Sequence, residues 1–531
     1  MAKRHAEEAL ESPTSKRSRL EDDEDLDKPV PSGPIRQDAP TEGYADLYLD
    51  TIDRSRLDFD FEKICSVSNV TINIYACLVC GTYFQGRGPK SNAYTHSLSE
   101  DHHVFINMET KKVYVLPDGY EVKDKSLDDI KYNVDPSFTK DQVYELEKKP
   151  NATWDLAGKK YIPGFVGLNN IKANDYFNVV IHALAHVPMI RNYFMLEDFS
   201  TRGGIARQFS SLVRKIWNPQ AMKAHVSPHE LLQAVSVQSK NRFNSTTQSD
   251  PVEFLTDFLQ RLHSDVGGTK PGSSFIHRVF QGHMLIESQN IITRNVAGDR
   301  RRIEEDGEVE AKKQRFMILP LQLPPTPLFQ DELDKNFIPQ VTLNKLLGKF
   351  SQDGVLTKSD PFERKSMSTA PFTDKFNGRD AQEKGEKRVR YRLLHPLPPY
   401  IIMWVGRFSQ NKYSTERNPT IVNFPLRSLD LNPYCQPNPD IHPQSEPILY
   451  DLVANITHEA VRGSKDEGVE TDRERKKVWR VQVHERGNDE WYEVQDLFVD
   501  KVEGQTLFTK ESYCMIWEKR RTPKGKGKGK Q

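Results

Sequence analysis

Four cysteine and histidine residues constrain the fold of this chain most strongly, because their spacing is that of a metal site. Cys77 and Cys80 are separated by two residues, and His96 and His102, further along, are separated by five. Two thiolates and two imidazoles form the tetrahedral ligand set that zinc prefers. A zinc ion with four protein ligands has no open coordination position. We therefore expect one structural Zn²⁺ and no metal catalysis at this site.

The sequence alone does not decide whether two further residues, Cys65 and His103, are also zinc ligands. Cys65 is either another ligand or a small buried residue, and His103 would share the face of His96 in an unbroken helix. The segment between the cysteines and His96 contains Gly86 and Gly88 and lacks the ββα pattern of a DNA-reading finger. We therefore expect a structural module that does not read DNA.

Composition predicts two folded regions between two charged tails. Residues 1–42 and 521–531 are rich in charged residues, so we expect a disordered tail at the start and a flexible Lys/Gly tail at the end. Residues 43–150 should form the zinc-binding domain. Residues 160–520 should form a larger domain, whose length allows a substantial core.

Local patterns predict an α+β fold for the larger domain. Ser227–Glu230 and Asp250–Glu253 both look like capping boxes with proline at the first helical position. The apolar run 400–405 predicts a buried strand. Two charged stretches, 294–314 and 351–388, lack apolar periodicity, and we expect them to be loops or insertions.

The tails suggest a compartment and a weak contact. Lys3-Arg4 and Lys16–Arg19 are spaced like a bipartite nuclear import signal, which we favour over a merely solvated tail. The basic tail Lys524–Lys530 either touches RNA phosphate weakly or is solvated. Lys+Arg and Asp+Glu both number 75, so no bulk charge draws the chain to nucleic acid or membrane. No apolar run is long enough to span a bilayer, and five cysteines do not make a disulfide framework.

The segment Gly167–Asn178 carries a family resemblance. It resembles the first signature of ubiquitin-specific proteases, Gly-Leu-x-Asn-Leu-Gly-Asn-Thr-Cys-Tyr-Met-Asn, and the catalytic Cys of that signature falls on Asp175. Asn170 matches the asparagine of the oxyanion hole. Apolar residues recur at helical spacing after Asp175, so we expect it at a helix start, acting as a cap and not as a new catalytic group.

Later segments resemble the same family in the same order. Gln248–Leu255, Leu397–Phe408 and the strand that begins at Trp491 match its motifs. The family's general-base His lies thirteen residues before that Trp, which is Val478 here, and its orienting Asp or Asn lies four after, which is Gln495. The resemblance implies a papain-like fold with helical thumb and β-rich palm and fingers, in which the catalytic positions are degenerate. We therefore expect a pseudo-deubiquitinase.

The metal site also resembles a family module. Ala76–Gly81 and the segment from Gly86 to His102 resemble the zinc finger of ubiquitin proteases, in which His102 is the fourth ligand. Gln85 and Asn92 replace a Cys and a His of fuller versions, which argues against ubiquitin binding.

A finger of this type beside a protease domain without its triad resembles the inactive ubiquitin-specific-protease homologues of the spliceosomal tri-snRNP. Further matches include Leu57–Lys63 and Lys223–Glu230. This resemblance implies a non-catalytic nuclear scaffold for pre-mRNA splicing, which assembles or stabilises the U4/U6.U5 particle through contacts with its proteins. The alternative is a nuclear ubiquitin-binding adaptor without hydrolase activity.

Overall fold

The computed structural model describes residues 48–146, 148, 151–199, 203–296, 300–325, 338–350, 354–355, 384–410, 415–443, 445–461 and 476–520. The predictions for both tails, including the import signal and the basic tail, lie outside these residues. The chain forms two compact units. The first runs up to Leu57 and resumes over Lys63–Asp128, and the second contains Asp58–Glu62 and the chain from Asp129 onward.

The first unit is built on an antiparallel sheet with the order β2-β1-β3-β4-β5. Every residue of β1 and β3 is buried, because Tyr75, Phe84 and Phe105 pack into one small core. The strands are β1 Ile74–Cys77, β2 Tyr83–Gln85, β3 Val104–Asn107, β4 Val113–Val115 and β5 Tyr120–Val122. The helices are α1 Asn92–Ser99 and the short 3-10 turns Leu49–Thr51, Arg54–Arg56 and Lys125–Leu127.

The second unit begins with a helical layer. Every residue of the α4 helix is buried, including the polar Asp175, Asn178 and His182, which makes it the central helix of this layer. The helices are α2 Asp128–Val134, α3 Lys140–Leu146, α4 Asp175–Ala185, α5 Pro188–Leu196, α6 Ile205–Ile216, α7 His229–Gln238, α8 Pro251–Asp265, α9 Phe275–Phe280 and α10 Leu343–Leu347. Three 3-10 turns span Gly348–Phe350, Asn432–Tyr434 and Gly504–Thr509.

One of the two predicted capping boxes is confirmed and the other is wrong. The Asp250 carboxylate accepts hydrogen bonds from the amides of Val252 and Glu253, so α8 is capped as expected. In contrast, α7 begins at His229 with Pro228 as its N-cap and no side-chain capping bond. The amide of Ser227 instead donates to the distant Asp60 carboxylate at 2.9 Å, which sets the start of α7.

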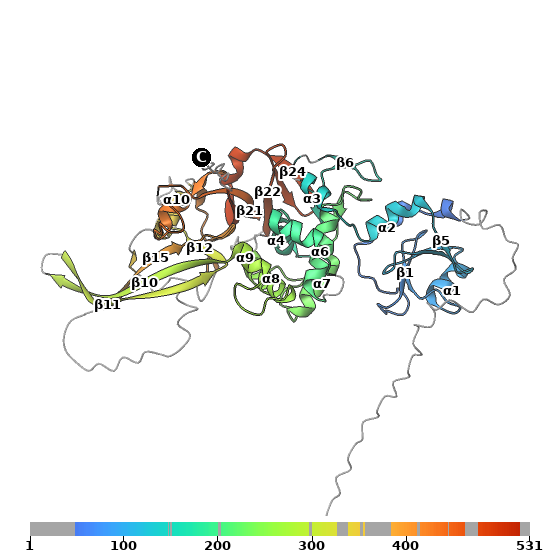
Figure 1. The fold of residues 1–531 in the computed structure, drawn as a ribbon, viewed down its shortest axis with the longest axis horizontal. Helices are drawn as coiled ribbons and strands as arrows, with labels where there is room; N and C mark the ends of the chain where they lie inside the picture. Colours follow the sequence, from blue (N-terminus) through green and yellow to red (C-terminus); the bar gives the residue numbers. More distant parts are fainter. Residues whose placement is uncertain are drawn as a thin grey trace, which may run out of the picture. The chain divides into compact units, whose positions relative to one another are not determined.

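An eight-stranded sheet packs against α4 through β21 and β22 (Figure 1). Its order is β12-β16-β25-β21-β22-β23-β24, with β20 added to β21, and only the β12–β16 pair is parallel. The strands are β12 Ile318–Gln322, β16 Tyr400–Gly406, β20 Leu429–Asp430, β21 Leu449–Val461, β22 Lys476–Glu485, β23 Glu490–Gln495, β24 Phe498–Val502 and β25 Glu511–Lys519. The predicted strand at 400–405 is thus confirmed, as is the α+β class.

A second sheet corrects the prediction for the charged stretches. Residues 294–314 were expected to be a loop or insertion, but the described ones, 294–296 and 300–314, belong to the long strands β10 and β11, which extend away from α9 in Figure 1. The sheet order is β11-β10-β15-β14, with β10 Gly282–Val296, β11 Arg300–Phe316, β14 Gly354–Val355 and β15 Lys384–Leu394. Backbone pairing to β15 fixes β10 on its second side, so order here does not require an apolar stripe. The predicted loop 351–388 contains β14 and the start of β15, and its remaining residues lie outside the described ranges.

Four small two-stranded pairs complete the second unit. They are β6 Thr153–Trp154 with β7 Lys160–Tyr161, β8 Gly167–Leu168 with β9 His225–Val226, β13 Gln340–Thr342 with β19 Ile421–Asn423, and β17 Phe408–Gln410 with β18 Thr415–Arg417. Among the described residues, no single helix is long and apolar enough to cross a bilayer. The bent pair of α4 and α5 passes that test by length and composition alone, and α4 is buried in the core.

Candidate metal centre and candidate active site

The structure brings the four predicted zinc ligands together in the first unit. Cys77 ends β1, Cys80 lies in the following turn, His96 lies in α1 and His102 precedes β3. One ligand atom from each lies within 4.8 Å of all the others. The turn depends on Gly81, whose φ is +78° and where a Cβ would lie 2.4 Å from a backbone oxygen.

The distances between the ligand atoms fit zinc. His96 Nε2 lies 3.1 Å from His102 Nδ1 and 3.5 Å from Cys80 Sγ. Zinc bonds of about 2.0 Å to nitrogen and 2.3 Å to sulfur give tetrahedral N···N and N···S edges of roughly 3.3 and 3.5 Å. A hydrogen bond shared by the two sulfurs raises the pKa of Cys77 and lowers the pKa of Cys80.

His103 and Cys65, the two possible additional zinc ligands, form hydrogen bonds with residues outside the metal cluster. His103 Nδ1 lies 2.8 Å from the Leu116 carbonyl oxygen, and its Nε2 lies 2.8 Å from the Asp101 carboxylate. Cys65 Sγ accepts hydrogen bonds from the amide of Ser68 and from Nδ2 of Asn92, at 3.4 and 3.3 Å. Neither belongs to the four-residue cluster.

Asp175 begins α4 as expected, but the prediction that it caps the helix is wrong, because Asn174 occupies the N-cap position before it. Its carboxylate accepts three hydrogen bonds: from the Tyr176 amide at 2.9 Å, Gln248 Nε2 at 2.6 Å and the Trp479 amide at 3.2 Å. The residue is only 5% exposed, and burial raises the pKa of this carboxyl despite the three donors. Asp175 therefore joins the helical layer to β22 through a buried carboxylate.

The other predicted active-site positions are linked to this region through residues next to them in the chain. Val478 is buried in β22, next to the Trp479 amide that donates to Asp175. Gln495 ends β23, and Asn170 Nδ2 donates at 3.2 Å to the adjacent Asp496 carboxylate. The four positions are thus brought into one region through their neighbours. None of them offers a thiol or an imidazole.

An asparagine network that the sequence analysis missed supports this region. Asn174 Nδ2 donates to the Asn169 carbonyl and to the Asn178 side chain, and the Asn174 amide donates to Asn170 Oδ1. Asn178 Nδ2 in turn donates to the carbonyls of Leu168 and Asn169. The run of asparagines in the Gly167–Asn178 segment was the available signal. Both polar ends of Asn170 are therefore used to hold the loop that leads into α4.

The thiols of Cys435 and Cys514 and the buried ring of His458 do not supply a nucleophile and a general base. Burial raises the pKa of Cys435 to about 12 and raises that of Cys514 as well, so both are held as thiols. His458 is 3% exposed and packs between the rings of Phe408 and Trp479, with Nδ1 3.6 Å from Glu511. A nucleophile and a base must lie within hydrogen-bond reach, and no such contact joins these described residues.

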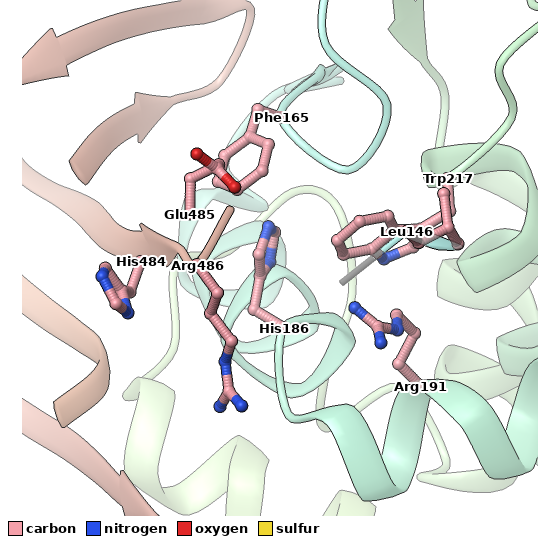
Figure 2. A pocket seen from close by; sticks show the side chains of 8 residues that line it. All are labelled: Leu146, Phe165, His186, Arg191, Trp217, His484, Glu485 and Arg486. Carbon is pink, nitrogen blue, oxygen red and sulfur yellow. The ribbon is translucent and has the colours of Figure 1, made fainter. Parts of the chain in front are cut away.

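One groove lies beside Asp175, and a small cavity lies at the other end of α4. A groove of about 1040 Å³ is lined by Gln248 and Trp479, by α8 and by the end of β11 around Phe316. A second cavity of about 20 Å³ lies among Phe165, His186, Trp217 and two arginines, as Figure 2 shows. It has room for about one water molecule. His186 Nε2 has no partner among the described residues, and burial lowers the pKa of His186 to about 4, so the ring is neutral.

Comparison with family models gives two matches. The model described as "Ubiquitin carboxyl-terminal hydrolase" matches residues 166–517. The model described as "Zn-finger in ubiquitin-hydrolases and other protein" matches residues 65–127 and so includes the Cys/His cluster. The first match covers most of the described second unit, including every position at the Asp175 site.

Similar proteins include a Schizosaccharomyces pombe protein named "Probable mRNA-splicing protein ubp10", 42% identical over 527 residues and covering 97% of each chain. The human protein "Ubiquitin carboxyl-terminal hydrolase 39" is 43% identical over 486 residues, which are 89% of this chain and 80% of that protein. A solved structure, "Crystal structure of an essential yeast splicing factor", matches with a TM-score of 0.66 and 27% identity over 89% of this chain and 100% of that one. These likenesses agree with the α+β fold and with the zinc-finger assignment.

Proposed function

The chain belongs to the ubiquitin carboxyl-terminal hydrolase family, and from that premise we propose that it is a non-catalytic member that acts as a scaffold in pre-mRNA splicing. In this role it assembles or stabilises the U4/U6.U5 tri-snRNP in the nucleus through contacts with spliceosomal proteins. Two relatives with splicing in their names support the role. They are the Schizosaccharomyces pombe protein described above and the Saccharomyces cerevisiae protein "Pre-mRNA-splicing factor SAD1", which is 28% identical over 481 residues. The basic C-terminal tail would add at most a weak RNA contact.

The observation that carries the non-catalytic part of the proposal is the environment of Asp175. The Asp175 carboxylate, at the position where the resemblance places the nucleophile, is held by two backbone amides and one side-chain amide. A carboxylate is a poor nucleophile toward an amide, and Val478 has no atom that takes a proton. Asn170 is occupied by Asp496, so it is not poised for an oxyanion. The arrangement stabilises the fold where an active member would carry out hydrolysis.

We also propose one structural zinc in the first unit, bound by Cys77, Cys80, His96 and His102. When bound, zinc cross-links the end of β1, α1 and the start of β3, and it supplies no catalytic step because all four positions are filled by protein. The interatomic distances and the family of the module support this set.

The proposal is tested by two measurements on the full chain. The purified protein should release no fluorophore from a fluorogenic ubiquitin substrate, under conditions in which an active family member does. An affinity-tagged copy should purify from nuclear extract with U4, U6 and U5 RNAs, whereas a copy without its tag should not. Substrate turnover that is lost in the Asp175→Ala variant would contradict the assignment of the site. Absence of all three RNAs would contradict the role in splicing.

A second candidate function is that of a ubiquitin-binding adaptor. The groove beside Gln248 and Trp479 favours it, because about 1040 Å³ of open space remains next to the position of the nucleophile. Equilibrium binding of unmodified ubiquitin to the full chain separates the candidates. Saturable binding that is weakened by a bulky substitution in the groove, Thr256→Trp, would favour the adaptor, and absence of binding would leave the scaffold.

A further inference from the structure

Five residues between the two segments of the first unit belong to the second unit. The chain leaves the first unit at Leu57, contributes Asp58–Glu62 to the second, and returns at Lys63. The sequence of these five residues is Asp-Phe-Asp-Phe-Glu, with acids and aromatic rings in alternation. The segment is not a strand: it bends at Asp60 and Phe61, and the Asp58 carboxylate accepts a hydrogen bond from the Asp60 amide at 3.1 Å. Such a local turn formed by an Asp side chain can present acids and rings to different partners.

The acids of this segment contact a basic face of the second unit. Asp58 accepts a hydrogen bond from Lys223 Nζ at 2.7 Å, just before β9. Asp60 accepts one from the amide of Ser227, just before α7, at 2.9 Å. Glu62 lies 3.8 Å from His229, the first residue of α7. The three acids therefore contact three successive positions of the second unit, and both sets follow the same order along the chain.

A buried lysine anchors the middle of the segment. Lys215, in α6, is only 8% exposed, and its Nζ donates to the Phe59 carbonyl oxygen at 2.7 Å. The same ammonium lies 3.2 Å from Asp60 and 3.7 Å from Glu230. Burial alone lowers the pKa of Lys215, but the two carboxylates raise it above its ordinary value, so the side chain stays charged. A buried charge of this kind must keep its partners, and two of them come from the segment.

The two aromatic residues of the segment add apolar contacts to these charged ones. Phe59 is 6% exposed, whereas Phe61 is 44% exposed and meets the His229 ring edge-on with centroids 5.7 Å apart. One ring is thus buried and the other lies against the surface. Anchoring by a buried ring, paired charges and main-chain hydrogen bonds is how short peptides are recognised in grooves.

We propose that the face formed by α6, β9 and the start of α7 is a recognition site for a short acidic and aromatic peptide, and that Asp58–Glu62 is its resident ligand. Lys215 donates a hydrogen bond to the Phe59 carbonyl and forms an ion pair with the Asp60 carboxylate. Lys223 donates to the Asp58 carboxylate, and the Ser227 amide donates to the Asp60 carboxylate. The site recognises peptide and is separate from the groove beside Asp175. Because the ligand is part of the same chain, a high effective concentration keeps the site filled even if the isolated peptide binds weakly.

The first test empties the site in the full chain. Residues 58–62 are replaced by Gly-Ser-Gly-Ser-Gly, and a fluorescein-labelled peptide with the sequence Leu-Asp-Phe-Asp-Phe-Glu-Lys is titrated and followed by fluorescence polarisation. We expect saturable binding that weakens with salt. A matched peptide with Asn at both Asp positions, and the Lys215→Met change in the emptied chain, should each weaken binding by about tenfold or more, since each removes hydrogen bonds to charged groups. The unaltered chain should bind the peptide poorly, because its site is filled.

The second test needs no emptied chain and covers the case in which that variant fails to fold. In otherwise unaltered protein, Asp60→Asn should speed hydrogen exchange at the Ser227 amide by about tenfold or more, because a neutral amide oxygen replaces the charged acceptor of its hydrogen bond. Asp50→Asn, at an exposed acid of the first unit, is the matched control and should leave that amide unchanged. Equal peptide binding by the Asp and Asn peptides, or unchanged exchange at Ser227 in Asp60→Asn, would overturn the proposal.

Discussion

Replacing Asp175 with alanine removes the acceptor that joins α4 to β22. The amides of Tyr176 and Trp479, both in buried residues, lose their partner, whereas Gln248 is exposed and turns to water. A buried amide left without an acceptor costs about 1–3 kcal/mol. Two such amides cost about 2–6 kcal/mol, and relief from burying the carboxylate offsets part of this. We expect a net loss of about 2–4 kcal/mol in the local stability of this junction.

Native-state hydrogen exchange measures this loss where it occurs. A loss of that size speeds exchange of the Trp479 amide by about 30-fold to several hundredfold, since about 1.4 kcal/mol corresponds to tenfold. Asp175→Asn keeps one oxygen acceptor and should show a smaller effect. Asp440→Ala, at an exposed acid, is the matched control and should show none. If Trp479 exchanges at the same rate in Asp175→Ala as in the parent chain, the carboxylate does not hold β22 and the reasoning is wrong.

Three other outcomes are expected. Cys77→Ala should lose its zinc and unfold the first unit, because the binding energy of structural zinc is folding energy; unchanged metal content and melting would contradict the ligand set. Asp175→Cys alone should not cleave a fluorogenic ubiquitin substrate, because a missing general base costs about 10²–10⁴ in rate and Val478 cannot supply one. Burial lowers the pKa of His182 to about 3 and of His186 to about 4. The stability from these neutral rings is fully present above about pH 6.5 and is lost as pH falls from there toward 4, so the denaturation midpoint should drop over that window in the parent and less in His186→Phe.

Features set by local chemistry could be predicted from the sequence. The clustering of Cys77, Cys80, His96 and His102 could be predicted because two short spacings and the ligand preferences of one metal leave few alternatives. The cap of α8 was found because Asp250 bonds to amides two and three residues away. The burial of the strand at 400–405 followed from its apolar run.

Features set by distant partners could not be predicted. The capping box at Ser227 fails because its amide is bound by Asp60, which is 167 residues away in the chain. Asp496 was missed because its partner, Asn170, is separated from it by 326 residues. The strands at 294–314 owe their order to backbone pairing within a sheet that includes the distant β15, and this pairing leaves no periodic signal in a charged stretch.

The central claim is that the Asp175 site performs no hydrolysis, and a C-terminally electrophilic ubiquitin probe tests it most directly. The full chain is incubated with the probe beside an active family member and analysed by intact mass. We expect no covalent adduct, because Asp175, at the proposed position of the nucleophile, is a buried carboxylate and the thiols of Cys435 and Cys514 are buried and protonated. A stoichiometric adduct on any residue of the second unit would contradict it.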